Sequence, residues 1–254
     1  MKKKGFLIKN RDKFQINHKK TLSIIQNRIL LFQILKAKRY FKGNLLDVGC
    51  GERPYMLIYD ELVKKSIGID IPNSLHSLDP TVIPTKAEAL PFGENIFDVV
   101  LCTEVLEHVD NFFKALSEIR RVMKSKGKLI FSVPFMYPLH EFPNDNLRFT
   151  YFGILHSLEK TGFKILNIKA KGGAVTLFTS LLFIIISQVL IQLEKYTKIR
   201  FFSCNFIRWL IYLFQDFYSK IFLFSQCSKY SSEHTTISKY EQFLSMGYFG
   251  VAEK

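Results

Sequence analysis

The chain has 254 residues, of which 48% are hydrophobic and 15% aromatic, so a disordered or collagen-like chain is excluded and a sizeable core can be buried. Its four cysteines lie far apart with no C-x-x-C pair, which favours neither a zinc site nor a disulfide framework. The basic start of the chain is followed by polar residues rather than an apolar run, so we expect no secretory signal. These features predict a cytoplasmic protein without a metal site.

The net charge of +14 is concentrated at the N-terminus. Residues 1–42 hold 13 Lys or Arg against one Asp, whereas residues 43–171 have a balance of −1. We interpret 1–42 as a basic arm followed by an amphipathic helix over Leu22–Phe41. The arm could contact nucleic acid or an anionic membrane surface, or be a solvated tail.

Short apolar strands alternate with helical stretches between Leu45 and Val133, which is typical of a parallel α/β sheet. Two of the strands are nearly continuous apolar runs, as expected for strands buried on both faces. Strands are predicted at Asn44–Val48, Lys65–Asp70, Phe97–Cys102 and Lys128–Val133, and helices at Asn111–Lys124 and Thr150–Thr161.

Glycines follow the first predicted strand, in the segment Asp47–Glu52 (DVGCGE). Glycines at this point let the backbone approach a ligand, and the N-terminus of a following helix favours polar groups. Asp70 ends the next strand, 21 positions after Gly49, where a carboxylate can accept hydrogen bonds from ribose hydroxyls. The dinucleotide fingerprint requires a glycine where Pro54 stands, so the pattern indicates a nucleoside-containing cofactor other than NAD or FAD.

Six segments in succession resemble motifs of the class I S-adenosylmethionine-dependent methyltransferases, in the small-molecule branch called methyltransferase type 11. They are LLDVGCGERPY (45–55), GIDI (68–71), AEALPF (87–92), FDVVLCTEVLEHV (97–109), MKSKGKLIFSVP (123–134) and RFTYFGILHSLEKTGFKI (148–165). The resemblance covers roughly residues 20–171 and returns at 247–254. It implies an α/β fold with a Rossmann-like seven-stranded sheet and S-adenosylmethionine as cofactor.

The resemblance also implies the cofactor contacts, residue by residue. Asp47, Gly49 and Gly51 would lie against the methionine part and Asp70 against the ribose; Ala87 and Leu90 would flank the adenine, and Cys102, Thr103 and Glu104 would close the site. Two positions depart from the family pattern: Arg53 replaces the third glycine of the first motif, and Lys86 replaces the acidic residue that commonly precedes the alanine.

A polar loop, residues 138–150, follows the strand predicted at Lys128–Val133, where the resemblance implies that acceptors reach the methyl group. It resembles the H-E-x-P-x-D-x-x-R-x-T stretch of family members associated with glycan and cell-envelope biosynthesis. Histidine is the most common general base, so we assign His140 and Asp145 as candidate catalytic residues. The alternative is that both residues pair with Arg148 to fix the loop, and His108 is expected to be structural.

An insertion of 75 residues, 172–246, separates the strands predicted at Phe163–Lys171 and Gly247–Glu253, which would pair antiparallel. Ala174–Leu193 contains no charge in 20 positions, and Asn205–Phe224 has one aromatic and one polar face. Both flanking strands belong to one sheet, so a single membrane crossing is impossible. Two crossings would place Arg208 and Asp216 inside the bilayer, at a free-energy cost of roughly 2.5 to 3.5 kcal/mol for each charged side chain. We therefore expect a hydrophobic helical hairpin that lies in one leaflet.

The sequence thus divides into residues 1–42, a core over 43–171, the insertion 172–246 and a last core strand over 247–254. We expect a methyltransferase at the inner face of the cell membrane, contacting it through residues 174–224 and acting on a small-molecule or lipid-linked acceptor such as an envelope saccharide. The alternatives are a non-catalytic cofactor-binding or membrane-adaptor protein and an RNA methyltransferase. Nucleic acid is disfavoured because residues 43–171 show no interleaving of basic and aromatic side chains. The acceptor atom and the oligomeric state do not follow from the sequence.

Overall fold

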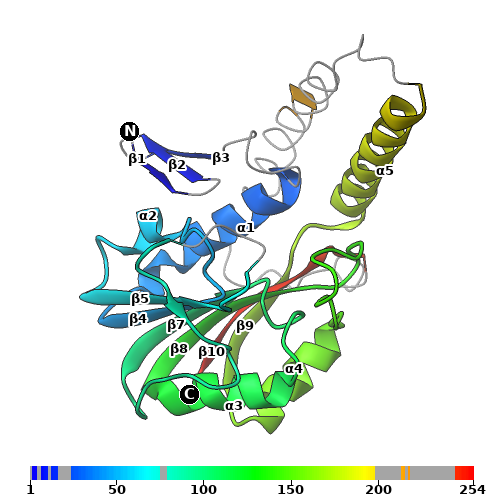
Figure 1. Cartoon of the computed structure of the whole chain (residues 1–254). Helices are drawn as coiled ribbons and strands as arrows, with labels where there is room; N and C mark the ends of the chain where they lie inside the picture. Colours follow the sequence, from blue (N-terminus) through cyan, green and yellow to red (C-terminus); the bar gives the residue numbers. More distant parts are fainter. Residues whose placement is uncertain are drawn as a thin grey trace.

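The computed structural model describes residues 2–4, 7–10, 13–16, 24–74, 79–197, 213–214, 217 and 244–254. Its centre is a seven-stranded sheet between two layers of helices (Figure 1). In spatial order the strands are β6 (Ile83–Pro84), β5 (Lys65–Asp70), β4 (Asn44–Val48), β7 (Phe97–Thr103), β8 (Met123–Pro134), β10 (Gly247–Glu253) and β9 (Lys164–Ala170). The predicted Rossmann-like sheet is confirmed.

The first five strands in this order are parallel, and β10 runs antiparallel between β8 and β9. Strand order reverses between β4 and β7, because the chain first builds outward through β5 and β6 and then returns to the other side of β4. In open α/β sheets such a reversal leaves a crevice at the carboxyl ends of the strands.

Helices cover both faces of this sheet. One face packs against α3 (Phe112–Val122) and α4 (Tyr151–Lys160), and the other against α1 (Ile24–Lys36), the 3₁₀ turn η2 (Ala37–Tyr40) and α2 (Met56–Tyr59). The starts of α3 and α4 are capped by side chains: the Asn111 side chain accepts from the Lys114 N–H, and Thr150 Oγ1 accepts from the Gly153 N–H, each at 3.0 Å.

The N-terminal segment differs from the predicted arm. It contains a small antiparallel sheet of β1 (Lys2–Lys4), β2 (Leu7–Asn10) and β3 (Lys13–Ile16). The side chain of Leu7 is fully buried among core residues of α1 and α2, such as Leu30 and Tyr59. This contact explains why a segment rich in lysine still folds against the domain.

The insertion begins with α5 (Ala174–Thr197), which extends the predicted helix by four residues and projects away from the main sheet (Figure 1). Its base packs on α1 through Leu177 and Phe183, which meet Ile25 and Ile29. Within the described residues, no helix combines the length and the apolarity needed to span a bilayer.

The second predicted helix of the insertion, 205–224, lies almost entirely outside the described residues. Leu213, Phe214 and Phe217 are described, and they are helical and exposed. The ring centroid of Phe214 lies 5.7 Å from that of Phe183 in α5.

Candidate functional site

A pocket of about 310 Å³ opens at the carboxyl ends of β4, β5 and β7, the crevice that the strand order creates. Four of the residues predicted from the sequence to bind the cofactor line it: Gly49, Asp70, Ala87 and Glu104. The remaining wall residues come from the same strand ends, the segment after β6, the turn after β7 and the loop after β8. They are Val48, Ile69, Ile71, Asn73, Ser74, Thr85, Lys86, Glu88, Val105, His108, Val109, Asp110, Glu141, Phe142, Pro143 and Asn144.

The turn after β4 is held in place by Asp70. Oδ2 of Asp70 accepts a hydrogen bond from the Gly51 N–H at 2.7 Å, and Oδ1 accepts from the Ile71 N–H at 2.7 Å. Gly49 has a φ of +62°, and a Cβ on it would lie 2.2 Å from Cγ2 of Val105. A side chain at Gly49 would therefore push the turn and the wall opposite it apart. Gly51 contributes its backbone to this arrangement rather than to the pocket wall.

Asp47 lies behind the pocket rather than on its wall. Its carboxylate is buried and accepts a hydrogen bond from the hydroxyl of Tyr59 at 2.7 Å. Burial raises the pKa of Asp47 to about 7, against the lowering effects of Tyr59 and Arg53. Three further predicted contact residues, Leu90, Cys102 and Thr103, are also absent from the wall; Leu90 and Cys102 are buried in the core beneath it.

The two departures from the family pattern have local explanations. Arg53 adopts a φ of +53°, and its buried guanidinium donates to Thr81, Ser66 and Tyr59, pointing away from the pocket. Lys86 stands on the pocket wall, where its ammonium lies 2.7 Å from Oδ2 of Asp110. Arg53 therefore takes no part in the pocket wall, whereas Lys86 lines the pocket with its ammonium held by Asp110.

Glu104 connects the pocket wall to the base of the insertion. Its carboxylate accepts hydrogen bonds from the fully buried Lys171 ammonium at 2.5 Å, the Ser132 hydroxyl at 2.6 Å and the Gln26 amide at 2.9 Å. Burial disfavours the charged carboxylate, but Lys171 and the other donors outweigh it, and the pKa of Glu104 lies below its ordinary value. Lys171 immediately precedes the insertion, so the insertion is anchored at the pocket.

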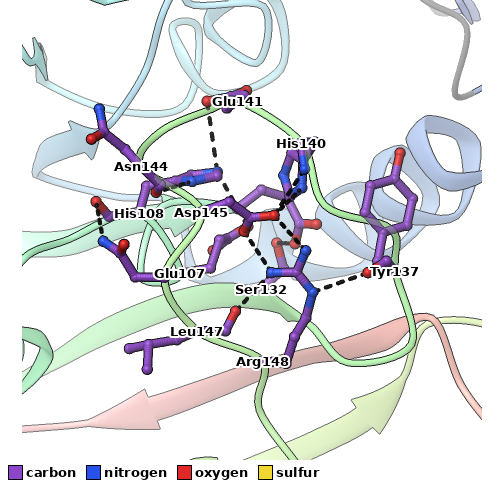
Figure 2. A network of polar contacts seen from close by, with 12 residues as sticks. Glu107, His108, Ser132, Tyr137, His140, Glu141, Asn144, Asp145, Leu147 and Arg148 are labelled. Carbon is purple, nitrogen blue, oxygen red and sulfur yellow. Dashed lines mark hydrogen bonds and ion pairs between the residues drawn. The ribbon is translucent and has the colours of Figure 1, made fainter.

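His140 and Asp145 lie in the loop after β8, next to the pocket but not on its wall (Figure 2). The guanidinium of Arg148 donates hydrogen bonds to both carboxylate oxygens of Asp145, at 2.5 and 2.6 Å. Burial raises the pKa of Asp145, but the donors Arg148 and the His140 N–H outweigh it and bring it to about 2. Asp145 is therefore an anion that holds the loop in place, and the catalytic assignment of both His140 and Asp145 stays a prediction.

Two residues that were not predicted to bind a ligand lie at or just behind the pocket wall. The imidazole of His108 lines the pocket, and its ring centroid is 4.9 Å from that of His140. The neighbouring Glu107 is fully buried behind the wall, and among the described residues no hydrogen bond reaches either of its carboxylate oxygens. Burial and the Glu104 carboxylate raise the pKa of Glu107 well above its ordinary value. The sequence feature that could have indicated these two residues is the succession of Glu104, Glu107 and His108 directly after a predicted strand.

The wall fits a nucleoside-containing cofactor. Asp70 presents carboxylate oxygens with spare acceptor capacity, as ribose hydroxyls require, and the apolar side chains of Ile71, Ala87 and Val109 offer a surface for a flat base. An α/β sheet with an acidic residue at the end of its second strand, beside a glycine turn, defines a nucleotide-type cofactor-binding protein.

Comparisons with known proteins specify this class further. Residues 46–131 match a family model described as a methyltransferase domain. Two uncharacterized proteins of Methanocaldococcus jannaschii are similar: MJ0638 is 40% identical over 110 residues, covering 42% of this chain and 47% of that protein, and MJ1123 is 30% identical over 162 residues, covering 57% and 76%. The matched part thus spans only about half of the length of MJ0638.

Among solved structures, the [4+2]-cyclase SpnF shares the fold, with a TM-score of 0.55 and 16% identity over 99% of this chain and 86% of that one. The chain belongs to the class I S-adenosylmethionine-dependent methyltransferase family, whose cofactor is S-adenosylmethionine.

Proposed function

We propose that this protein transfers the methyl group of S-adenosylmethionine to an acceptor held at a membrane surface, such as a lipid-linked or cell-envelope saccharide. The observation that carries the methyl-transfer part is the pocket, because it joins the glycine turn, Asp70 and Ala87 of the family motifs in one cavity. When bound, the cofactor supplies the reactive sulfonium methyl group. The protein has to hold the cofactor, align the acceptor and exclude water.

The membrane part of the proposal is supported by the surface of α5. Val175, Phe178, Leu182, Ile185 and Val189 recur at helical spacing and are each more than half exposed, with no charged residue between them. An apolar stripe of this kind suits the boundary between lipid headgroups and acyl chains. Because Lys171, the residue before the insertion, pairs with Glu104 of the pocket wall, a membrane bound by α5 would lie on the side of the protein where the insertion leaves the pocket.

The charges of the pocket wall support a small or lipid-linked acceptor over nucleic acid. Five acidic residues, Asp70, Glu88, Glu104, Asp110 and Glu141, face the pocket with one lysine, Lys86. A phosphate backbone needs cationic partners at the point of contact, and this wall offers few. The proposal therefore excludes RNA as the acceptor despite the basic N-terminal segment.

The experiment uses the purified full chain and S-adenosylmethionine with a labelled methyl group. The protein is incubated separately with total membrane lipids and with the aqueous extract of the source cells, and the labelled product is identified by mass spectrometry. We expect label in the lipid fraction, and a strong reduction with the Asp70→Ala variant. Label in the aqueous fraction alone would retain methyl transfer and overturn the membrane-held acceptor; no transfer to either would overturn the proposed function.

A further inference from the structure

Three side chains with metal-binding atoms converge beside the pocket. Ligand atoms of Glu107, His108 and His140 all lie within 4.8 Å of one another. Glu107 and His108 belong to the turn after β7, whereas His140 comes from the loop after β8, 32 residues further along the chain. The two segments are fixed to each other, because the carbonyl of Glu107 accepts hydrogen bonds from the Asn146 N–H at 2.9 Å and the Leu147 N–H at 3.1 Å.

The carboxylate of Glu107 is buried without a hydrogen-bond partner in the part of the chain that the structure describes. Its side chain is fully buried, and neither of its carboxylate oxygens accepts a hydrogen bond from a described residue. The closest approach of a ring nitrogen is 3.8 Å, from Nε2 of His108 to Oε1. Burying a carboxylate without a partner is costly, and a protonated carboxyl would still need an acceptor for its hydroxyl. A bound cation would remove this cost.

The hydrogen bonds of the two histidines leave lone pairs for a cation. Nδ1 of His108 lies 2.9 Å from the Asn144 carbonyl oxygen, which can only accept, so the proton is on Nδ1 and the lone pair on Nε2. Nδ1 of His140 lies 3.2 Å from Oδ2 of Asp145 and 3.3 Å from the Pro138 carbonyl oxygen, which assigns its lone pair to Nε2 as well. Metal-binding histidines are held in this way, by a carbonyl or carboxylate at the second nitrogen.

We propose that Glu107, His108 and His140 bind a divalent first-row transition-metal ion at the wall of the pocket. Two imidazole nitrogens and one carboxylate favour ions such as Zn²⁺ or Mn²⁺ over Ca²⁺, which prefers oxygen ligands. Three protein ligands leave coordination positions open, as in catalytic rather than structural sites. His108 faces the pocket, so an oxygen atom of an acceptor could occupy an open position. This last step alone rests on the proposed methyltransferase function.

In the proposed site, Asp145 and Arg148 orient the ligand His140. Arg148 holds the Asp145 carboxylate, which in turn accepts a hydrogen bond from the backbone N–H of His140 and lies 3.2 Å from its Nδ1. These are positioning residues, because they orient a ligand without contacting the ion.

Isothermal titration calorimetry of the full chain, previously dialysed against a chelator, tests the site. Zn²⁺ and Mn²⁺ are titrated separately into wild type and into Glu107→Gln, His108→Ala and His140→Ala. We expect one ion per chain and at least a ten-fold loss of affinity in each variant. The matched control is His156→Ala, since His156 is exposed on α4 outside the cluster and its loss should leave the affinity unchanged.

Thermal unfolding and S-adenosylmethionine binding establish that each variant is folded. If Glu107→Gln does not fold, the two histidine variants and the visible spectrum of added Co²⁺, which reports nitrogen ligands, still decide the question. Absence of binding by wild type, or equal affinity in the histidine variants and His156→Ala, would overturn the site. Because these measurements need no turnover, a metal-binding protein without methyl transfer would overturn the proposed function and leave the metal site standing.

Discussion

Asp70 fixes two consecutive strand ends at once, because its two carboxylate oxygens accept from the N–H groups of Gly51 and Ile71. We predict that Asp70→Ala weakens S-adenosylmethionine binding by about 1.5 to 3 kcal/mol, the scale of hydrogen bonds to a charged group. Calorimetry measures the change, with Asp60→Ala as the control because Asp60 is exposed at the end of α2. Unchanged affinity in a folded Asp70→Ala variant would remove Asp70 from the cofactor site.

His140 supports a second prediction, on turnover. As a base, or as a ligand to a metal ion that binds the acceptor, it acts after the cofactor is bound, and it does not line the pocket. His140→Ala should lower turnover by roughly 10² to 10⁴ and leave cofactor affinity unchanged. Steady-state kinetics with the acceptor found in the labelling experiment, together with calorimetry for the cofactor, measure both quantities. Retained turnover would leave His140 with a structural role.

Asp47 gives a prediction about pH. Its pKa is about 7 in the fold, against an ordinary 3.8, so between these pH values the folded state holds a proton that the unfolded chain has lost. The contribution of Asp47 to stability is therefore complete below about pH 4 and is lost as the pH rises to about 7, a change of roughly 4 kcal/mol. Asp47→Asn keeps an acceptor for Tyr59 and removes the titration.

Urea unfolding at several pH values, with wild type and Asp47→Asn compared at each, isolates this contribution. The free energy of unfolding of wild type should fall relative to the variant as the pH increases. A constant difference between the two proteins would show that Asp47 ionises normally in the folded state.

Part of the pocket wall could be predicted from the sequence, whereas the cluster of Glu107, His108 and His140 could not. Gly49, Asp70 and Ala87 follow strands or motifs that are recognisable in the sequence, so their approach to one pocket follows from the fold. Glu107 and His108 also follow a predicted strand, but they meet His140 only through the path of an irregular loop. Loop paths depend on side-chain contacts such as that of Arg148 with Asp145, which periodicity does not encode.

Whole strands also differ in whether the sequence predicts them. β4, β5 and β10 have the predicted bounds because each is a short apolar strand of a buried sheet. The small sheet of β1, β2 and β3 was not predicted, because its sequence is dominated by lysine and its stability depends on contacts made by residues such as Leu7. The charge and the hydrophobic periodicity of a segment do not show which of its side chains tertiary contacts will bury.

The buried ion pair of Lys171 and Glu104 joins the end of β9 to the end of β7. Removing one partner leaves an uncompensated buried charge, so Lys171→Met should lower the free energy of unfolding by about 3 to 5 kcal/mol. The double variant Glu104→Gln/Lys171→Met should recover part of this loss, because no charge is then left alone. Urea denaturation measures both, and an unaltered stability of Lys171→Met would show that the pair does not anchor the insertion.

The exposed stripe of α5 leads to a prediction at the level of one helix. Replacing Phe178, Leu182 and Ile185 by Ser should reduce binding to lipid vesicles at least 100-fold, since each fully buried apolar side chain contributes about 1.5 to 3 kcal/mol. Vesicle flotation measures the bound fraction, and Phe113→Ser is the control because Phe113 is exposed on α3, which covers the opposite face of the sheet. Equal binding by the triple variant would assign the stripe to another contact.

At the level of the whole molecule, the basic N-terminal sheet and α5 both adjoin α1, on the same side of the main sheet (Figure 1). One side of the protein thus carries the lysines of the described N-terminal strands, such as Lys3 and Lys4, together with the exposed apolar helix; the whole segment 1–42 has a net charge of +12. These two features would contribute separately to membrane binding: electrostatic attraction of about 1 kcal/mol for each Lys or Arg close to anionic lipid, and apolar insertion that does not depend on charge.

Salt separates the two contributions. Raising the ionic strength from 0.1 to 1 M shortens the screening length from about 10 to about 3 Å, which weakens the attraction of lysine for anionic lipid but not the burial of α5. We therefore expect the protein to bind vesicles containing anionic lipid more tightly than neutral ones at low salt, and to be released only partly at high salt. Flotation at both salt concentrations measures this. Complete release at high salt would mean that α5 does not enter the lipid, and absence of binding to either vesicle would favour an acceptor in solution for the same methyl-transfer site.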